Sequence, residues 1–314
     1  MKVLITGGFG YVGGRLAQYL MSQKSDEVFL GTRREKNSPV WLPQAQVVQT
    51  RWDSSAELEN ICTGMDAVVH TAGMNAQDCT VNPVAALEFN GVATSRLLQA
   101  AVRQGVKRFI YLSTGHVYGR PLVGVITEET CPINLHPYAT SHRAGEDVVR
   151  AASQRGEIEG VVIRLSNAFG TPSHKDVNCW MLLINDLCQQ AVTSGKMVLY
   201  SSGLQRRDFV PMADVCRAID YLLCFSLQDL SHVVFNVGGM WSPTVWEVAC
   251  LVQQQCESVL AFYPQLTRVP PQAEDKSDEL EYRMDALCQT GFKLCADRTT
   301  EIDRLLEFCK TSFA

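Results

Sequence analysis

The sequence of 314 residues lacks the patterns that mark several large classes of protein. It contains no run of five or more basic residues, and its formal net charge is -5, so nucleic acid is not an expected partner. It contains no apolar stretch near the ~18 residues of a membrane span, so we expect no membrane segment. The N-terminus shows no signal peptide, because Lys2 is followed by a short apolar run and then at once by glycines.

Cysteine is abundant, but its spacing is not that of a metal site or a disulfide framework. None of the twelve cysteines forms a C-x-x-C pair, and the closest two, Cys250 and Cys256, are six positions apart. We therefore predict no structural zinc and no other metal site. Thiols in this number, without paired spacing and without an export signal, favour a reducing cytoplasm.

The first half of the sequence alternates short apolar runs with amphipathic stretches. With 46% hydrophobic residues the chain can form a packed core, and its length suits about two domains. The periodicity predicts strands at 2–6, 28–30, 47–49, 67–70, 109–113 and 161–165, and helices at 56–62, 83–104 and 138–155. Repeated strand–helix–strand units predict an α/β fold of the Rossmann type, with a doubly wound parallel sheet.

The second half is less regular. It predicts helices at 180–193, 245–260 and 298–309, strands at 197–200 and 233–237, and a solvated acidic loop at 274–281. We expect residues 1–170 with 204–238 to form a dinucleotide-binding domain. We expect residues 171–203 with 239–314 to form a smaller C-terminal α/β substrate domain, with the substrate at the carboxyl ends of the strands.

The strongest local motif is the segment from Thr6 to Gly13, which reads T-G-G-F-G-Y-V-G. It contains both G-x-x-G-x-x-G and G-x-G-x-x-G, follows an expected strand and opens an expected helix. Glycines let the backbone approach a pyrophosphate, and the helix N-terminus offers free N–H groups. The alternative is a turn that only packs a helix on a strand. We predict dinucleotide binding by Gly7, Phe9, Gly10, Tyr11, Val12 and Gly13.

The end of the second expected strand carries two arginines, Arg33 and Arg34. A site for NAD normally has an acidic residue here that binds the ribose 2′-hydroxyl, but no carboxylate precedes Glu35. Two guanidinium groups suit a 2′-phosphate instead. We therefore expect NADP to be preferred over NAD, the alternative being an ordinary exposed basic turn.

Two further segments complete a family resemblance. Residues 112–119 read L-S-T-G-H-V-Y-G, and residues 138–142 read Y-A-T-S-H. Together with the glycine turn they resemble the extended short-chain dehydrogenase/reductases, in particular the NAD-dependent epimerase/dehydratase group that acts on nucleotide sugars. The resemblance implies that Thr114 and Tyr138 are catalytic, and it places His142 where the family has a catalytic lysine.

The resemblance continues along nearly the whole chain. Residues 164–170 read R-L-S-N-A-F-G and residues 206–210 read R-R-D-F-V, and both are similar to segments that lead into the family's substrate region. By this resemblance the substrate, a nucleoside-diphosphate sugar, would contact His116, Asn167 and Arg207. Further cofactor contacts would come from Asp53, Thr71, Ala72, Gly73, Asn90 and Ser113.

The histidine at position 142 makes the activity harder to predict. A tyrosine hydroxyl has an ordinary pKa near 10 and becomes a base near neutral pH only when a neighbour favours its charged form. Positions four apart share a helix face, so residue 142 can stand beside Tyr138. A carboxylate or phosphate close by would keep His142 charged, whereas without one the imidazole is mostly neutral at pH 7. The sequence leaves both states open.

The motifs restrict the reaction without settling it. Sugar 4,6-dehydratases of this group typically carry Asp-Glu after the threonine, and this chain carries Gly115 and His116, which disfavours dehydration. Reduction of a 4-keto sugar and 4-epimerisation remain, with a nucleotide-binding regulatory or scaffold protein as the alternative. In this family the pair of helices that corresponds to 83–104 and 138–155 forms a dimer contact. We therefore predict a homodimer. Ala85, Leu87, Val92 and Leu98 offer apolar faces for it, although some of them must face the sheet of their own subunit.

Overall fold

The computed structural model describes residues 1–23, 26–35, 37–226, 233–275 and 277–314. The chain forms two compact units. The first contains residues 1–120, 131–165 and 216–236, and the second contains residues 121–130, 166–215 and 237–314. This division differs from the expected one in four segments: residues 121–130, 166–170, 204–215 and 237–238 belong to the second unit. Residues 124–126, 167–169 and 209–211 form strands that pair with strands of that unit.

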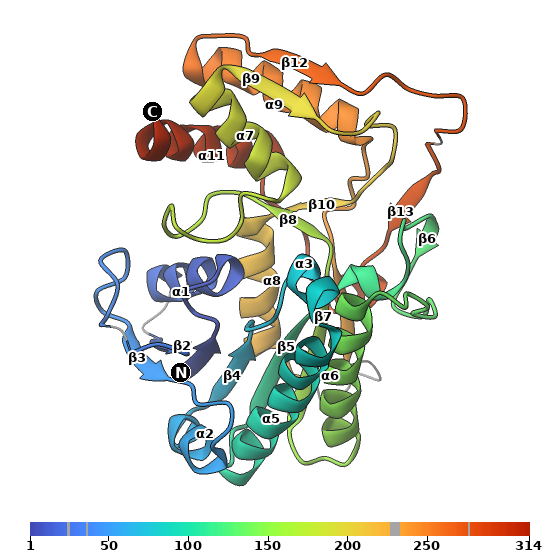
Figure 1. Cartoon of the computed structure of the whole chain (residues 1–314). Helices are drawn as coiled ribbons and strands as arrows, with labels where there is room; N and C mark the ends of the chain where they lie inside the picture. Colours follow the sequence, from blue (N-terminus) through green and yellow to red (C-terminus); the bar gives the residue numbers. More distant parts are fainter. Residues whose placement is uncertain (24–25, 36, 227–232, 276) are drawn as a thin grey trace. The chain divides into compact units, whose positions relative to one another are not determined.

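A seven-stranded sheet forms the centre of the first unit (Figure 1). Its order is β11-β7-β5-β4-β1-β2-β3, and the pairings from β7 to β3 are all parallel. The strands are β1 (Lys2–Thr6), β2 (Glu27–Thr32), β3 (Gln46–Gln49), β4 (Ala67–His70), β5 (Arg108–Thr114), β7 (Glu159–Leu165) and β11 (Val234–Val237). The chain adds strands on one side of β1 and then on the other, so the carboxyl ends of β1 and β4 flank a topological switch point. The predicted Rossmann-type α/β fold is confirmed.

Helices cover this sheet. They are α1 (Tyr11–Gln23), α2 (Ser55–Cys62), α3 (Ala76–Val81), α4 (Pro83–Ala86), η1 (Leu87–Ala93), α5 (Thr94–Arg103), the short η2 (Gly115–Val117), α6 (Pro137–Gln154) and α8 (Met212–Cys224). Leu4, Val68 and Phe109 on the strands pack with Leu58, Leu97 and Val149 on the helices. Burial of these side chains holds α2, α5 and α6 against the sheet.

The helix expected at 83–104 is not uniform. Pro83 begins it after the N-cap Asn82, whose side chain accepts a hydrogen bond from Ala85 N, and the run then passes through the π-helical segment η1 before α5. π-Helical turns are uncommon and occur often at functional sites. Asn90 and Gly91 lie in η1 and face α6, where a Cβ on Gly91 would be 3.2 Å from Ala144 Cβ.

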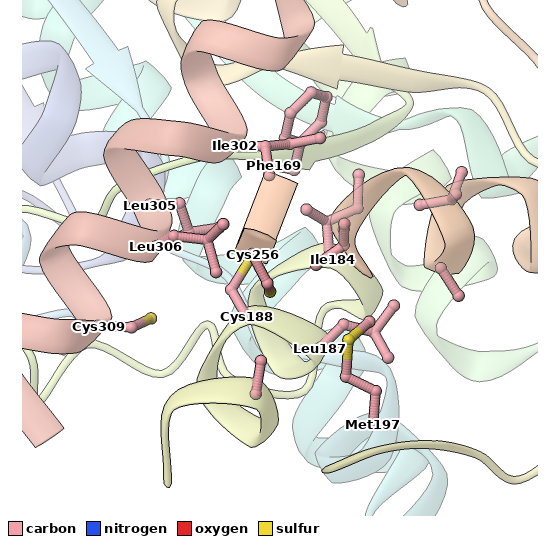
Figure 2. Packing of buried hydrophobic residues seen from close by; sticks show 14 of the residues in the cluster. Phe169, Ile184, Leu187, Cys188, Met197, Cys256, Ile302, Leu305, Leu306 and Cys309 are labelled. Carbon is pink, nitrogen blue, oxygen red and sulfur yellow. The ribbon is translucent and has the colours of Figure 1, made fainter. Parts of the chain in front are cut away.

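The second unit has three two-stranded parallel sheets rather than one large sheet. The pairs are β6 (Gly124–Ile126) with β13 (Leu280–Tyr282), β8 (Asn167–Phe169) with β10 (Phe209–Pro211), and β9 (Lys196–Leu199) with β12 (Gln265–Arg268). Its helices are α7 (Leu183–Ser194), α9 (Val245–Leu260), α10 (Asp285–Gln289) and α11 (Arg298–Phe313). Figure 2 shows its core, in which Leu187 of α7, Cys256 of α9 and Leu305 of α11 pack together.

Two expectations about this half need correction. The helix expected from residue 180 begins at Leu183, because residues before it form turns. The acidic stretch expected as a loop at 274–281 ends in strand β13, which begins at Leu280, and its residue 276 lies outside the described residues. Within the described ranges, no helix is both long and apolar enough to cross a membrane.

Candidate active site

The glycine turn between β1 and α1 can be formed only by glycine at two positions. Gly7 has a φ of 72°, and a Cβ there would lie 2.8 Å from Ala72 N. A Cβ on Gly13 would lie 2.5 Å from Gly7 O. Gly10 N donates to Gly7 O at 2.7 Å, and Gly10 is exposed at the start of α1. The turn thus presents bare backbone and a helix N-terminus at one point, which fits a pyrophosphate group.

The end of β4 lies beside this turn. The Thr71 hydroxyl donates to Thr6 O at 2.8 Å, and Ala72 N is the atom that a Cβ on Gly7 would meet. Gly73 is exposed, and a Cβ there would lie 3.4 Å from His142 Cε1. The structure therefore brings the predicted residues 71–73 to the glycine turn and to His142 together.

The other predicted cofactor residues fall into three groups. Phe9 packs edge-on against Trp41, with 6.0 Å between ring centroids, while Tyr11 and Val12 are half-buried at the start of α1. Arg33, Arg34 and Asp53 are exposed beyond β2 and β3. Asn90 and Ser113 are buried, and their side chains already hold protein partners.

Asn90 supports the loop that follows Gly73. Its Oδ1 accepts from Met74 N at 2.9 Å, and its Nδ2 donates to Ser141 Oγ at 3.0 Å. The side chain therefore ties η1 to both the loop after β4 and helix α6.

Thr114 and Tyr138 are adjacent in the structure. Thr114 ends β5, and its Oγ1 accepts from His116 N at 3.1 Å, which caps η2. Tyr138 lies in the first turn of α6 and hydrogen-bonds with the Thr114 hydroxyl. Burial raises the pKa of Tyr138 above its ordinary value, the hydrogen bond from Thr114 acts in the opposite direction, and Cys79 raises the pKa further. Tyr138 is therefore protonated at neutral pH.

His142 lies one helical turn after Tyr138 and packs against it. The ring centroids are 4.6 Å apart at an interplanar angle of 71°, an edge-to-face contact. His142 is buried, and burial alone lowers its pKa to about 4. Of the two states that the sequence left open, the structure supports the neutral imidazole. His142 Nδ1 lies 3.0 Å from the hydroxyl of Tyr111, a residue that the sequence did not single out.

A buried ion pair lies one further turn along α6. Glu146 accepts from Ser113 Oγ at 2.5 Å and from the Arg164 guanidinium at 2.6 to 3.2 Å. Arg164 also donates to Tyr118 Oη at 3.0 Å, and Tyr118 donates to Asn236 Oδ1 at 2.7 Å. Burial opposes the charge on Arg164, but Glu146 raises the pKa of Arg164 above its ordinary value. This network joins α6 to β5, β7 and β11.

Only an indirect signal for this network is present in the sequence. Arg164 stands in an apolar strand, and Glu146 lies four residues after His142 on the same helix face. A buried arginine needs a buried carboxylate, so the pair could have been suspected but not located.

The predicted substrate residues divide between the two units. His116 is half-buried in η2, and its carbonyl accepts from Asn134 Nδ2 at 2.7 Å. In the second unit, Asn167 begins β8 and donates to Asp208 O at 2.8 Å, while Arg207 is exposed two residues before β10 begins.

Asp208 organises the loop around Asn167 and was not predicted from the sequence. It is buried, and it accepts from Ser166 Oγ at 2.5 Å, Gly239 N at 2.9 Å and Trp241 N at 3.1 Å. Burial raises its pKa to about 6, against the lowering effect of these hydrogen bonds. Gly239 has no room for a side chain, because a Cβ would overlap Phe209 O.

A metal centre is not found among the described residues, in which no group of three or more His, Cys, Asp or Glu side chains could hold an ion. The site consists instead of a glycine turn, a hydroxyl pair and a neutral imidazole within the first unit.

Comparison with known proteins identifies relatives over most of the chain. Residues 3–238 match the model of the NAD dependent epimerase/dehydratase family. An uncharacterized UDP-glucose epimerase of Bacillus subtilis, YtcB, is 27% identical over 267 residues, which cover 81% of each chain. A dTDP-glucose 4,6-dehydratase of Streptomyces niveus is 26% identical over 82% of this chain and 78% of its own.

Solved structures agree in fold. UDP-glucose 4-epimerase from Thermotoga maritima, solved with UDP-glucose, superimposes with a TM-score of 0.82 at 19% identity over 100% of both chains. UDP-glucuronic acid 4-epimerase from Bacillus cereus, solved with UDP-glucuronic acid and NAD, gives a TM-score of 0.80 at 18% identity over 99% of both. The resemblance inferred from the motifs is confirmed, and the chain belongs to the NAD-dependent epimerase/dehydratase family of extended short-chain dehydrogenase/reductases.

Proposed function

We propose that this chain is an NAD(P)-dependent nucleotide-sugar oxidoreductase that works at a sugar carbon, by reduction of a 4-keto sugar or by 4-epimerisation. One observation carries the proposal: the Thr114–Tyr138 hydroxyl pair lies beside a neutral His142, whose ring lies near Gly73 next to the glycine turn. Catalytic hydroxyls and a dinucleotide cradle thus meet in one unit.

The glycine turn fits the cofactor because Gly7 and Gly13 leave no room for a Cβ and Gly10 is exposed. A nicotinamide held there supplies or accepts the hydride. In the reductive direction Tyr138 gives its phenolic proton to the oxygen of the sugar ketone as the carbonyl carbon gains hydride, which leaves an alcohol. Thr114 donates to the phenolate that remains, and solvent later restores the proton.

The protonation state of Tyr138 favours reduction over epimerisation. Burial raises its pKa, so at neutral pH the phenol is a ready proton donor. Epimerisation also needs the reverse step, in which Tyr138 takes a proton from a sugar hydroxyl as a phenolate. Neutral His142 adds no positive charge that would favour the phenolate.

The substrate that we propose is a nucleoside-diphosphate sugar. The family and the names of the relatives support this class, and Arg207 offers an exposed guanidinium of the kind that binds a diphosphate. Asn167, ordered through Asp208, and His116 are the further contacts that we assign to it.

For the cofactor we propose a preference for NADP over NAD. The two exposed guanidinium groups of Arg33 and Arg34 follow β2, and no carboxylate precedes Glu35 there. The Arg33 guanidinium lies 5.8 Å from the Phe89 ring centroid, which limits its freedom. Titration of the purified protein with NADPH and NADH tests the preference, and equal affinities would refute it.

We also propose a homodimer. Val84, Leu87 and Val92 on α4 and η1 are exposed apolar side chains, at 67%, 48% and 47% of their accessible surface. Leu98 does not contribute, because it packs in the core of the first unit at 4% exposure. Replacing Leu87 by Asp in this surface should convert the dimer to a monomer in light scattering, and a parent protein that is monomeric at micromolar concentration would refute the assembly.

A reducing cytoplasm is our proposal for its location. All twelve cysteines are free thiols. Burial raises the pKa of Cys62, Cys179, Cys256 and Cys309 to about 12, so these thiols resist oxidation. Fractionation of cells that express the tagged protein tests this, and recovery with secreted proteins would contradict it.

The decisive experiment for the activity has two steps. Mass spectrometry of the purified protein identifies any bound dinucleotide, and a panel of UDP- and dTDP-sugars, including 4-keto sugars, is then followed by nicotinamide absorbance and by product analysis. Turnover that falls by about 10²- to 10⁴-fold in Tyr138→Phe supports the proposal. Tight binding of dinucleotide and sugar with no turnover in either direction would favour the scaffold alternative.

A further inference from the structure

Tyr111 lies on β5, and its hydroxyl is within hydrogen-bonding distance of one ring nitrogen of His142. Tyr111 Oη is 3.0 Å from His142 Nδ1, and the two ring centroids are 5.9 Å apart. Both side chains are buried, at 1% and 6% exposure. A buried neutral imidazole has one N–H and one bare nitrogen, and the proton on its partner decides which is which.

The surrounding hydrogen bonds direct the Tyr111 proton towards His142. Two other groups lie near Tyr111 Oη. Asn90 O is 3.4 Å away and already accepts from Thr94 Oγ1 at 2.7 Å. The Thr94 hydroxyl also hydrogen-bonds with Tyr111, in the sense that lowers the pKa of Tyr111, which is that of a donor to the phenol oxygen. The shorter contact is the one with His142 Nδ1. A phenol is a good donor, so the arrangement satisfies the most groups when Tyr111 donates to Nδ1.

A proton on Tyr111 aimed at Nδ1 leaves the imidazole proton on Nε2. The Nε2 edge faces Gly73, because a Cβ on Gly73 would lie 3.7 Å from Nε2 and 3.4 Å from Cε1. Within the residues that the structure describes, no protein group hydrogen-bonds to Nε2. The free donor thus lies beside the exposed Gly73, next to the glycine turn.

Gly145 shows that the fold makes room for this contact. A Cβ on Gly145 would lie 2.5 Å from Tyr111 Oη and 2.7 Å from Asn90 O. Glycine inside a helix such as α6 normally reduces stability, so its presence here has a local reason. The reason is that only glycine lets the Tyr111 hydroxyl reach His142.

We propose that Tyr111 is a positioning residue that fixes His142 as the Nε2–H tautomer, so that His142 presents a neutral hydrogen-bond donor to an acceptor oxygen of a ligand bound beside Gly73. The role of that donor as a cofactor contact rests on the function proposed above. Its fixation by Tyr111 is a property of the protein itself. His142 then acts as neither a base nor a cation, since its acceptor nitrogen is covered and its ring is uncharged.

Nitrogen NMR of the full-length protein labelled at histidine tests the fixation. The signal of His142, one of six histidines, is assigned by its loss in His142→Gln. The parent should show a protonated Nε2 and a bare Nδ1. Tyr111→Phe should produce a mixture of both tautomers, and Gly145→Ala, which keeps the phenol but displaces it, should do the same. Tyr118→Phe, a buried tyrosine of the Glu146 network, should leave the His142 signals unchanged. A protonated Nδ1 in the parent, or an unchanged tautomer in both Tyr111→Phe and Gly145→Ala, overturns the proposal.

Cofactor affinity, measured by calorimetry, tests the donor. Gln at position 142 has an oxygen for the Tyr111 proton and an N–H for the ligand, whereas Met has neither. His142→Met should weaken dinucleotide binding about 10-fold and His142→Gln no more than about threefold. Tyr111→Phe should weaken binding in the parent but not in the His142→Met background. Equal losses of dinucleotide affinity in His142→Met and His142→Gln would overturn the donor role of His142. If the parent binds no dinucleotide, the proposed function fails, and the NMR result still decides the role of Tyr111.

Discussion

Two buried polar sites lie one turn apart on α6, and they differ in charge. Glu146 forms an ion pair with Arg164, with Ser113 and Tyr118 completing the hydrogen bonds. His142 is buried equally but is neutral, and its pKa falls to about 4 through burial alone. The helix therefore carries a charge at Glu146, where Arg164 supplies the opposite charge, and carries none at His142, the position next to Tyr138.

The contrast shows that burial does not by itself decide whether a side chain is charged. A buried ion is stable only when a partner of opposite charge compensates for lost solvation. At position 146 this partner comes from β7, and at position 142 the neighbours are the aromatic ring of Tyr138 and the hydroxyl of Tyr111. The first site joins the sheet to the helix, and the second adds no positive charge that would favour the phenolate of Tyr138, whose pKa is raised by its own burial.

The largest expected effect comes from breaking the charged site. Arg164→Met leaves the Glu146 carboxylate buried without its partner, and it should lower the free energy of unfolding by about 3–5 kcal/mol. Urea denaturation followed by circular dichroism measures the loss. The double variant Glu146→Leu with Arg164→Met should be more stable than Arg164→Met alone, because it removes both charges. A loss below about 1 kcal/mol in the single variant would mean that the pair is not desolvated.

Acid should destabilise the protein through the neutral site. His142 binds a proton in the unfolded chain with an ordinary pKa of 6.5 and in the folded chain only near 4. Between these values the unfolded state binds more protons, so the free energy of unfolding falls as pH falls. The total loss from this group is about 3 kcal/mol, and above pH 6.5 its contribution no longer changes with pH. Denaturation from pH 7 to pH 4 should be less pH-dependent in His142→Gln. Identical slopes in the two proteins would show that His142 is not buried neutral.

Gly145→Ala tests how tightly the neutral site is packed. A methyl group there would lie 2.5 Å from Tyr111 Oη, so we expect a loss of about 1–3 kcal/mol in stability despite the higher helix propensity of alanine. Gly64→Ala is the control for an added methyl group that meets no neighbour, because a Cβ there would have nothing within 4 Å. Any loss in that variant comes from the φ of 71°, which is unfavourable for alanine. A more stable Gly145→Ala protein would contradict the packing around Tyr111.

His142→Lys should give the neutral site a charge and change its pH response. An ammonium near Tyr138 favours the phenolate and lowers the pKa of Tyr138. Each pKa unit of lowering stabilises the phenolate relative to the phenol by about 1.4 kcal/mol. The rate of sugar oxidation, which uses the phenolate, should begin to rise at lower pH than in the parent, and the rate of reduction should begin to fall at lower pH. Cofactor affinity should change little. A pH–rate profile that is the same in both proteins would contradict the role of residue 142.

The smallest effect is expected at an exposed ion pair. Arg155 is the C-cap of α6 and Glu157 follows two residues later. Arg155 Nε and Glu157 Oε1 are 2.7 Å apart, and both side chains contact solvent. Arg155→Met should leave the denaturation midpoint unchanged, because water already solvates both charges. A midpoint shift as large as that of Arg164→Met would mean that the contribution of an ion pair to stability does not depend here on whether the pair is buried or exposed.

Much of the fold was predictable because it depends on local patterns. The apolar runs of β1, β4, β5 and β7 and the spacing of the glycines predicted the parallel sheet and the turn, and family resemblance located Thr114, Tyr138 and His142. The resemblance assigned Asn90 and Ser113 to the cofactor, whereas the structure gives their side chains protein partners. Both partners lie on α6: Ser141 is 51 positions from Asn90, and Glu146 is 33 positions from Ser113, so no local pattern links them.

The sequence by itself determined that a dinucleotide turn precedes a Thr–Tyr hydroxyl pair and that a histidine follows in the position of lysine. It could not determine the charge of that histidine, because a pKa depends on burial and on neighbours brought together by folding. The tertiary structure decided this. It placed Arg164 against Glu146 and Tyr111 against His142. Of these two polar residues four positions apart on one helix, Glu146 therefore has a charged partner and His142 has only an uncharged one.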